Sequence, residues 1–160
     1  MTIPQPAKPA WGNTLRLRAE VLITGGRTLT GFLHLQPIAP VHSGPERPED
    51  VLNRGDGFLP VTTEDDYTVF VAKEQVVVVA VATDLPVDDP DRVHAARSIG
   101  LRVELTDGSV FAGIVALEQP PSRSRALDFL NDGTGFFALH APEAIRFVNR
   151  RHIRLVTPLD

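Results

Sequence analysis

The 160-residue chain contains no cysteine and only one methionine, one tryptophan and one tyrosine. Without cysteine it cannot form a disulfide framework, a cysteine-ligated zinc site, an iron–sulfur cluster or a thiol nucleophile. Its longest nearly continuous apolar run, 76–82, is far too short to cross a bilayer. Residues 1–14 contain three prolines and show no signal-peptide pattern. These absences favour a cytoplasmic protein with no membrane segment.

Recognisable catalytic and cofactor-binding patterns are also missing. The five histidines do not stand at metal-ligand spacing from one another: they are His34, His42, His94, His140 and His152. The Gly133-Thr-Gly135 segment lacks the lysine of a phosphate-binding loop, and no dinucleotide or serine-triad fingerprint is present. We therefore expect a protein that is not an enzyme and takes no metal, cofactor or small-molecule substrate.

What the chain does contain is the composition of a soluble globular protein, with 42% hydrophobic and 22% charged residues. Its 14 prolines and 12 glycines predict many short elements. The net charge of −4 conceals an asymmetry between the halves. Residues 1–91 carry 7 basic and 13 acidic side chains, a balance of −6, whereas residues 92–160 carry 9 and 7, a balance of +2.

The two halves of the chain align with each other, which predicts an internal duplication. Fifteen identities occur at three successive separations of 82, 78 and 77 residues. They are Val21, Thr24, Gly26, Gly31 and Leu35 with 103, 106, 108, 113 and 117; Arg47, Asp50, Leu52, Asn53, Gly55, Gly57 and Phe58 with 125, 128, 130, 131, 133, 135 and 136; and Phe70, Val71 and Val79 with 147, 148 and 156. The separation changes in segments after Leu35 and Val61, where insertions are easily tolerated.

Residue patterns within each repeat are those of short strands. Residues 101–106 alternate between apolar and polar, Asp107-Gly108 is suited to a two-residue hairpin turn, and Gly113 is placed to bend the next strand. In the first repeat, Gly25-Gly26 and Gly31 occupy these places. We expect a short helix within 122–131, ended by a left-handed cap at Asn131-Gly133. Three further strands are expected at 135–139, 145–149 and 152–157.

These elements predict an all-β fold of two tandem small five-stranded barrels, each with a short helical insertion. The expected boundaries are a flexible arm at 1–14, a first barrel at 15–82, a linker at 83–98 and a second barrel at 99–160. The end of the linker is predicted to form a helix with Pro90 in its first turn.

Two segments of the second repeat resemble the two halves of the Sm-like signature of LSm and Hfq proteins. They are 103–108 (VELTDG) followed by Gly113, and 147–156 (FVNRRHIRLV). The first repeat carries a weaker copy in 21–26 (VLITGG), Gly31 and 70–76 (FVAKEQV). The resemblance implies an SH3-like barrel of the Sm-like type, and it implies RNA binding as a hypothesis. The helical insertion, the tandem arrangement and the absence of the second-motif glycine depart from the family pattern.

The most specific repeated motif, R-x-x-D-x-L-N-x-G-x-G-F, occurs at 47–58 and 125–136. Its Asp and Asn could form a polar or metal-binding site. We favour a structural interpretation, in which Arg and Asp pair at i, i+3 on a helix, Asn caps it and the glycines permit the following turn. The final residues, Phe58 and Phe136, are expected to be buried core anchors.

Two segments are candidate binding regions. A basic cluster near the end of the chain is the candidate nucleic-acid or partner site, because arginine binds phosphates and stacks on bases; its members are Arg146, Arg150, Arg151, His152 and Arg154. A strand that is apolar on both faces is the candidate domain or oligomer seam, because such a strand would aggregate if left open; its members are Val76, Val77, Val78, Val79 and Val81.

Two functions from different classes follow from these patterns. The first is a non-enzymatic interaction or scaffold module that binds a protein partner or forms a homo-oligomer. The alternative is an RNA-binding Sm-like protein that uses the basic edge of the second barrel.

Overall fold

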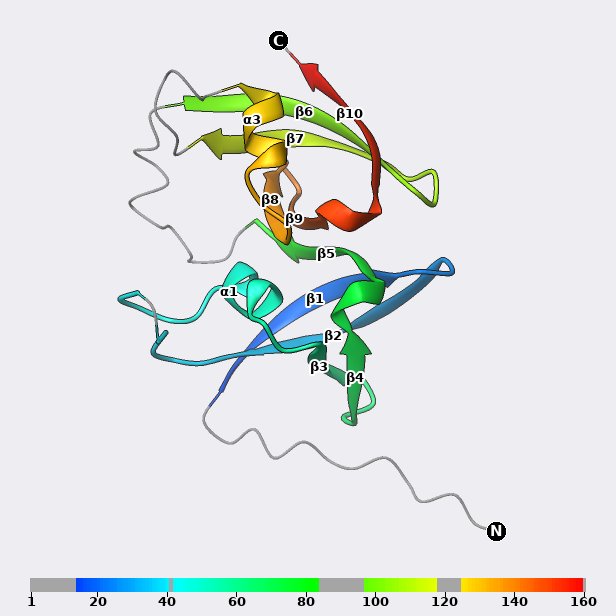
Figure 1. Cartoon of the computed structure of the whole chain (residues 1–160). Coiled ribbons are helices and arrows are strands. Elements are labelled where there is room, and N and C mark those ends of the chain that lie inside the picture. Colours follow the sequence, from blue (N-terminus) through cyan, green and yellow to red (C-terminus); the bar gives the residue numbers. More distant parts are fainter. Residues whose placement is uncertain (1–13, 41, 84–96, 118–124, 160) are drawn as a thin grey trace. The chain divides into compact units, whose positions relative to one another are not determined.

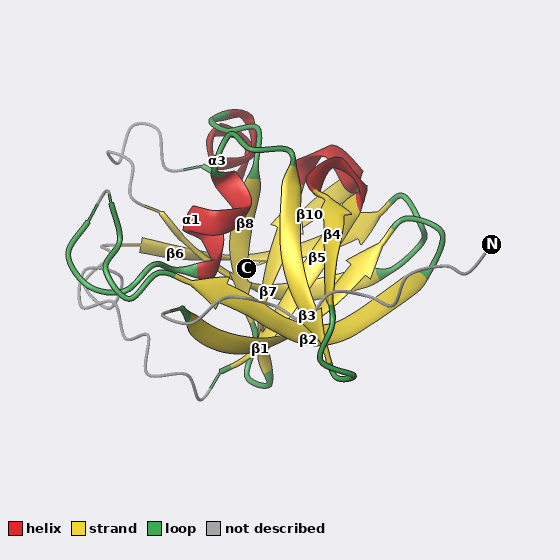
Figure 2. Ribbon diagram, turned by 90° about the horizontal axis from the view of Figure 1, so that it is seen from below, coloured by secondary structure: helices red, strands yellow, loops and turns green. Residues whose placement is uncertain are grey.

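A computed structural model describes residues 14–40, 42–83, 97–117 and 125–159 of the chain. The expected arm, apart from Thr14, and most of the expected linker, including Pro90, lie outside the described residues. Strands account for most of the described structure, so the protein is mainly β (Figure 2). It divides into two compact units, Met1–Val81 and Ala82–Asp160.

The described part of the first unit forms five strands, one short helix and one 3₁₀ turn, and its strands and helix are labelled in Figure 1. In chain order they are β1 (Leu15–Ile23), β2 (Arg27–Leu35), α1 (Pro48–Asn53), β3 (Phe58–Thr63), β4 (Thr68–Ala72), η1 (Lys73–Gln75) and β5 (Val76–Ala82). The strands pair antiparallel in the order β5-β1-β2-β3-β4.

The second unit repeats this series of elements (Figure 1). They are β6 (Arg97–Leu105), β7 (Val110–Leu117), α3 (Ala126–Asn131), β8 (Phe136–His140), β9 (Ala144–Asn149), η3 (Arg150–His152) and β10 (Ile153–Leu159). Their order is β10-β6-β7-β8-β9, the same order as in the first unit.

Strand registers in the two units coincide at the separations seen in the sequence. Gly31 pairs with Ala19, and Gly113 pairs with Leu101, each 82 residues further along. Phe58 pairs with Ala72 while Phe136 pairs with Asn149, which are displaced by 78 and 77 residues. The two units therefore align in backbone pairing as well as in sequence.

Each unit forms an open sheet rather than the closed ring of strands expected of a barrel. Among the described residues, β4 does not pair with β5, and β9 does not pair with β10. The pairing between the second and third strands is short, and in the first unit it involves only Gly31 and Phe32 of β2. A Cβ on Gly31 would lie 2.3 Å from the Thr62 carbonyl oxygen, so this close approach of the two backbones requires glycine.

One face of each sheet forms the core of its unit. In β6 the alternation expected from the sequence is confirmed, because Leu101, Val103 and Leu105 are fully buried while Arg102 is exposed. The equivalent strand β1 buries Leu17, Ala19 and Val21.

Two local expectations are wrong. The β6–β7 turn has a positive φ only at Gly108, and Leu105 exchanges backbone hydrogen bonds with Gly108 and Ser109. It is therefore a three-residue loop in which a left-handed glycine follows an ordinary turn, rather than a two-residue loop. The left-handed helix caps are also absent, because Arg54 and Asp132 follow α1 and α3 with negative φ.

Candidate functional site

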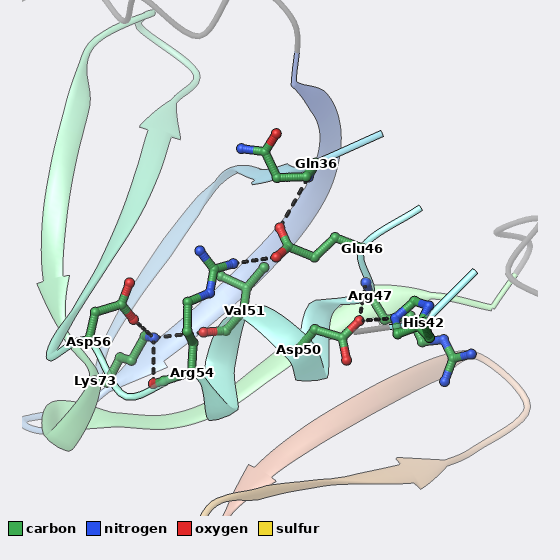
Figure 3. Close-up of polar contacts among 9 residues, drawn as sticks. All are labelled: Gln36, His42, Glu46, Arg47, Asp50, Val51, Arg54, Asp56 and Lys73. Carbon is green, nitrogen blue, oxygen red and sulfur yellow. Dashed lines mark hydrogen bonds and ion pairs between the residues drawn. The ribbon is translucent and has the colours of Figure 1, made fainter. Parts of the chain in front are cut away.

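The repeated motif of the first unit surrounds a buried lysine (Figure 3). Lys73 is the first residue of η1, and its ammonium donates to the carbonyl oxygens of Val51 (2.6 Å) and Arg54 (3.2 Å) at the end of α1. It also forms an ion pair with Asp56, which lowers the pKa of that carboxyl group. The cation satisfies helix carbonyls that would otherwise lack partners, which explains why no left-handed cap is needed.

The second unit places Arg150 at the equivalent position. Its guanidinium donates over long distances to the carbonyl oxygens of Phe129 (3.4 Å) and Gly135 (3.5 Å), and lies over the rings of Phe129 and Phe137. Burial lowers the pKa of this guanidinium. Thr134 stands where the first unit has Asp56.

Sequence reasoning missed this role of Lys73 and Arg150. The signal was present in the alignment, because matching Phe70-Val71 with Phe147-Val148 places a basic residue in both repeats at the same point. The pattern alone did not reveal that both side chains point inward to the helix.

The start of α1 is held by a second group of polar contacts (Figure 3). Asp50 Oδ2 accepts a hydrogen bond from the Arg47 backbone N–H (2.8 Å) and lies 2.6 Å from His42 Nε2. His42 Nδ1 lies 3.0 Å from the Ser43 carbonyl oxygen. These contacts raise the pKa of His42, chiefly through the hydrogen bond to Asp50.

A buried carboxylate secures the loop that leads into α1. Glu46 accepts from the backbone N–H of Gln36 (3.1 Å) and pairs with Arg54. The expected i, i+3 ion pair of the motif is present in the second unit, where Arg125 Nε lies 3.5 Å from Asp128. In the first unit Asp50 instead accepts from the backbone of Arg47.

This network holds the two ends of α1 in place. Its cations and carboxylates face one another or backbone groups, and within the described ranges no three His, Cys, Asp or Glu residues are placed to hold a metal ion. The same described residues include no helix long and apolar enough to cross a membrane.

Three members of the predicted basic cluster make contacts within the chain. Arg146 lies over the Phe111 ring (4.7 Å) and pairs with Glu143 (3.1 Å), and Arg154 Nε lies 3.3 Å from Glu104. Arg150 points to the end of α3, while Arg151 is exposed and His152 is half-buried.

The predicted apolar seam is buried on both faces of β5. All five of its valines are buried, including Val78, which is 3% exposed. None of the seven residues of the equivalent strand β10 is buried, and Leu155, the counterpart of Val78, is 50% exposed.

The expectation that Phe58 anchors the core is wrong. Phe58 is 61% exposed and Phe70 is 70% exposed, whereas their counterparts Phe136 and Phe147 are buried, at 6% and 3%. Pro60 pairs directly with Phe70 and lies two residues from Phe58, so these three side chains share the outward face of the β3–β4 hairpin. We call Phe58, Pro60 and Phe70 the aromatic face.

Comparisons of the chain with protein-family models, with curated proteins and with solved structures give no match.

Proposed function

We propose that the protein is a non-enzymatic interaction module, built from two duplicated five-stranded units, and that it binds further copies of itself head to tail. The proposal rests on two pairs of equivalent surfaces, each of which is exposed to solvent in one unit and buried in the other. The aromatic pair on the third and fourth strands is exposed in the first unit and buried in the second. The fifth strand is buried in the first unit and exposed in the second.

The two exposed surfaces lie beside strand edges that can accept another strand. In the described part of the chain, β4 pairs only with β3, and β10 pairs only with β6. Unpaired backbone groups along such edges favour the addition of a strand from another molecule. Because the surfaces belong to different units, joining β4 of one copy to β10 of another is heterologous and generates a ring or a filament.

Charges next to these edges are complementary. Glu74 is exposed in the turn that follows β4, while Arg151 is exposed in the equivalent turn before β10. Opposite charges at two edges favour their pairing and disfavour pairing of an edge with itself.

The test compares Phe70→Ser, which alters the β4 side, with Leu155→Ser, which alters the β10 side. Light scattering after size exclusion should show that the wild-type mass rises above 17.4 kDa with concentration, whereas each variant remains a single copy. A mixture of the two variants still has one intact pair of surfaces, so it should form dimers and nothing larger.

The control is Leu127→Ser, which removes an equally exposed apolar side chain from α3 and should leave assembly unchanged. Circular dichroism should confirm that all three variants fold. A wild-type protein that remains a single copy at every concentration, or variants that assemble as it does, would contradict the proposal.

RNA binding at the basic edge has less support in this geometry. Three of the five residues proposed for it are engaged within the chain, by Glu143, Glu104 and the end of α3. A titration with unstructured RNA at low salt would restore this alternative if the wild-type protein binds and the Arg151→Ala variant binds more weakly.

A further inference from the structure

The aromatic face lies next to the point where the described part of the chain begins. Thr14 Oγ1 lies 3.2 Å from His34 Nδ1, and His34 Nε2 lies 2.5 Å from Thr62 Oγ1 on β3. Thr62 and Pro60 are two residues apart on the same strand, so their side chains share one face. The described part of the chain therefore begins, at Thr14, on the side of the sheet that carries the aromatic face.

The preceding segment is long enough to cover this face. Trp11 is three residues from Thr14, which allows a reach of about 10 Å in an extended chain. From Thr62 to Pro60 the distance along the strand is only about 7 Å. The remaining residues, back to Met1, extend the reach well beyond Phe58 and Phe70.

Its chemistry is also suited to an exposed aromatic surface. Residues 1–13 contain Pro4, Pro6, Pro9, Ile3 and the only tryptophan of the chain. Proline-rich segments bind aromatic surfaces with little loss of conformational entropy, because their backbone is restricted before binding.

Charge favours the same placement. Lys8 is the only charged side chain in residues 1–13, whereas the β3–β4 turn beside the face contains Glu64, Asp65 and Asp66. Glu64 and Asp66 already pair with Arg18 and Arg16, and Asp65 is an exposed carboxylate at the same turn.

We infer that residues 1–13 bind across the aromatic face of their own unit when the protein is a single copy, with Trp11 and the prolines against Phe58, Pro60 and Phe70. This inference rests on the proposed function and concerns the same aromatic face. Residues 1–13 and a second copy of the chain compete for that face, so the segment regulates association. An exposed aromatic face beside an open edge is thereby covered before assembly.

Trp11 reports directly on this binding, since no other tryptophan contributes to the emission. Fluorescence and iodide quenching are measured at concentrations where light scattering shows a single copy. The wild-type emission should be blue-shifted and protected from iodide relative to a synthetic peptide of residues 1–13. The Phe58→Ser/Phe70→Ser variant should lose the shift and the protection, and Leu127→Ser should retain both.

A second measurement leaves the aromatic side chains intact. Because the chain has no cysteine, a nitroxide on Thr68→Cys, at the edge of the aromatic face, labels a single site. It should quench Trp11 by contact, whereas a nitroxide on Leu127→Cys should not. Quenching that is independent of concentration supports binding within one chain.

Trp11 emission equal to that of the free peptide, or protection retained after both phenylalanines are replaced, would overturn the inference. Protection that appears only as mass increases would show that the second copy, not residues 1–13, is the occupant. Failure of the proposed function is distinct: the mass would never rise, while Trp11 would still be protected in the single copy.

Discussion

Phe58 and Phe136 end the same repeated motif, yet one is exposed to solvent and the other is buried. Both residues are the first of a strand, and both pair with the last residue of the next strand. The motif therefore determines their position on the backbone. Whether the outward face of that strand is covered depends on the structure around it, and no residue within the motif determines it.

Two histidines of the first unit have pKa values displaced in opposite directions, so the stability of the protein should pass through a maximum with pH. Burial, followed by the nearby Arg16 charge, lowers the pKa of His34, whose ring is satisfied by the hydroxyls of Thr14 and Thr62. The pKa of His42 is raised by Asp50 and by the Ser43 carbonyl, which oppose the weaker effect of Arg47.

The signs follow from proton binding. His34 contributes stability that is present above the unfolded pKa of about 6.5 and is lost as pH falls through that value towards its lower folded pKa. His42 contributes stability that is present below about 6.5 and is lost as pH rises through its higher folded pKa. Urea midpoints measured between about pH 5 and 9 should therefore fall at both ends.

Variants separate the two effects. His34→Gln should flatten the acidic limb of the curve, and His42→Gln should flatten the basic limb while leaving the acidic one in place. A wild-type midpoint that does not change with pH, or variants with unchanged limbs, would contradict these assignments.

Among the elements, the second strand of each unit passes very close to a neighbouring backbone. A Cβ at Gly113 would lie 2.6 Å from the His140 carbonyl oxygen, which is a repeat of the contact between Gly31 and Thr62. Neither contact involves the flexible end of a side chain, so the strands must move apart to admit a methyl group.

Gly31→Ala and Gly113→Ala should therefore each lower the free energy of unfolding by about 1–3 kcal/mol, as overpacking of a close contact does. Gly55→Ala is the matched control, because no atom lies within 4 Å of its added Cβ and its φ is not positive. Urea denaturation of the three variants measures the difference. Equal stability of Gly31→Ala and Gly55→Ala would show that this close contact does not need glycine.

The two short helices were predicted from the sequence, but the contacts that hold their ends were not. The sequence indicated helices at the two motifs, and α1 and α3 lie there. Their ends are held by Lys73 and Arg150, which are distant in sequence and come from the turn before the last strand. Local residue patterns predicted glycine-dependent caps. Such patterns contain no information about a basic side chain, distant in sequence, that binds the carbonyl groups at the end of the helix.

At the scale of the whole molecule, the two units share strand order and register but differ in charge. Residues 1–91 carry −6 and residues 92–160 carry +2. If association joins β4 of one copy to β10 of another, it brings the acidic half of one molecule to the basic half of the next.

Raising the ionic strength from about 0.05 to 0.5 M should therefore weaken this association, because it shortens the screening length to a few ångströms. Sedimentation velocity at several protein concentrations measures the change. Association that strengthens with salt would point instead to a contact dominated by apolar burial, as between the aromatic face and Leu155 alone.

Sequence patterns alone predict the mainly β class, the positions of most strands and the three separations at which the registers of the two units coincide. These follow from alternation, turn residues and repeated identities, which act over a few neighbouring residues. The three-dimensional structure was needed to show that the sheets are open, that Phe58 is exposed, and that Lys73 and Arg150 point inward. An alternating sequence indicates that the two faces of a strand differ, but the atoms that pack against each face come from segments far away in the chain.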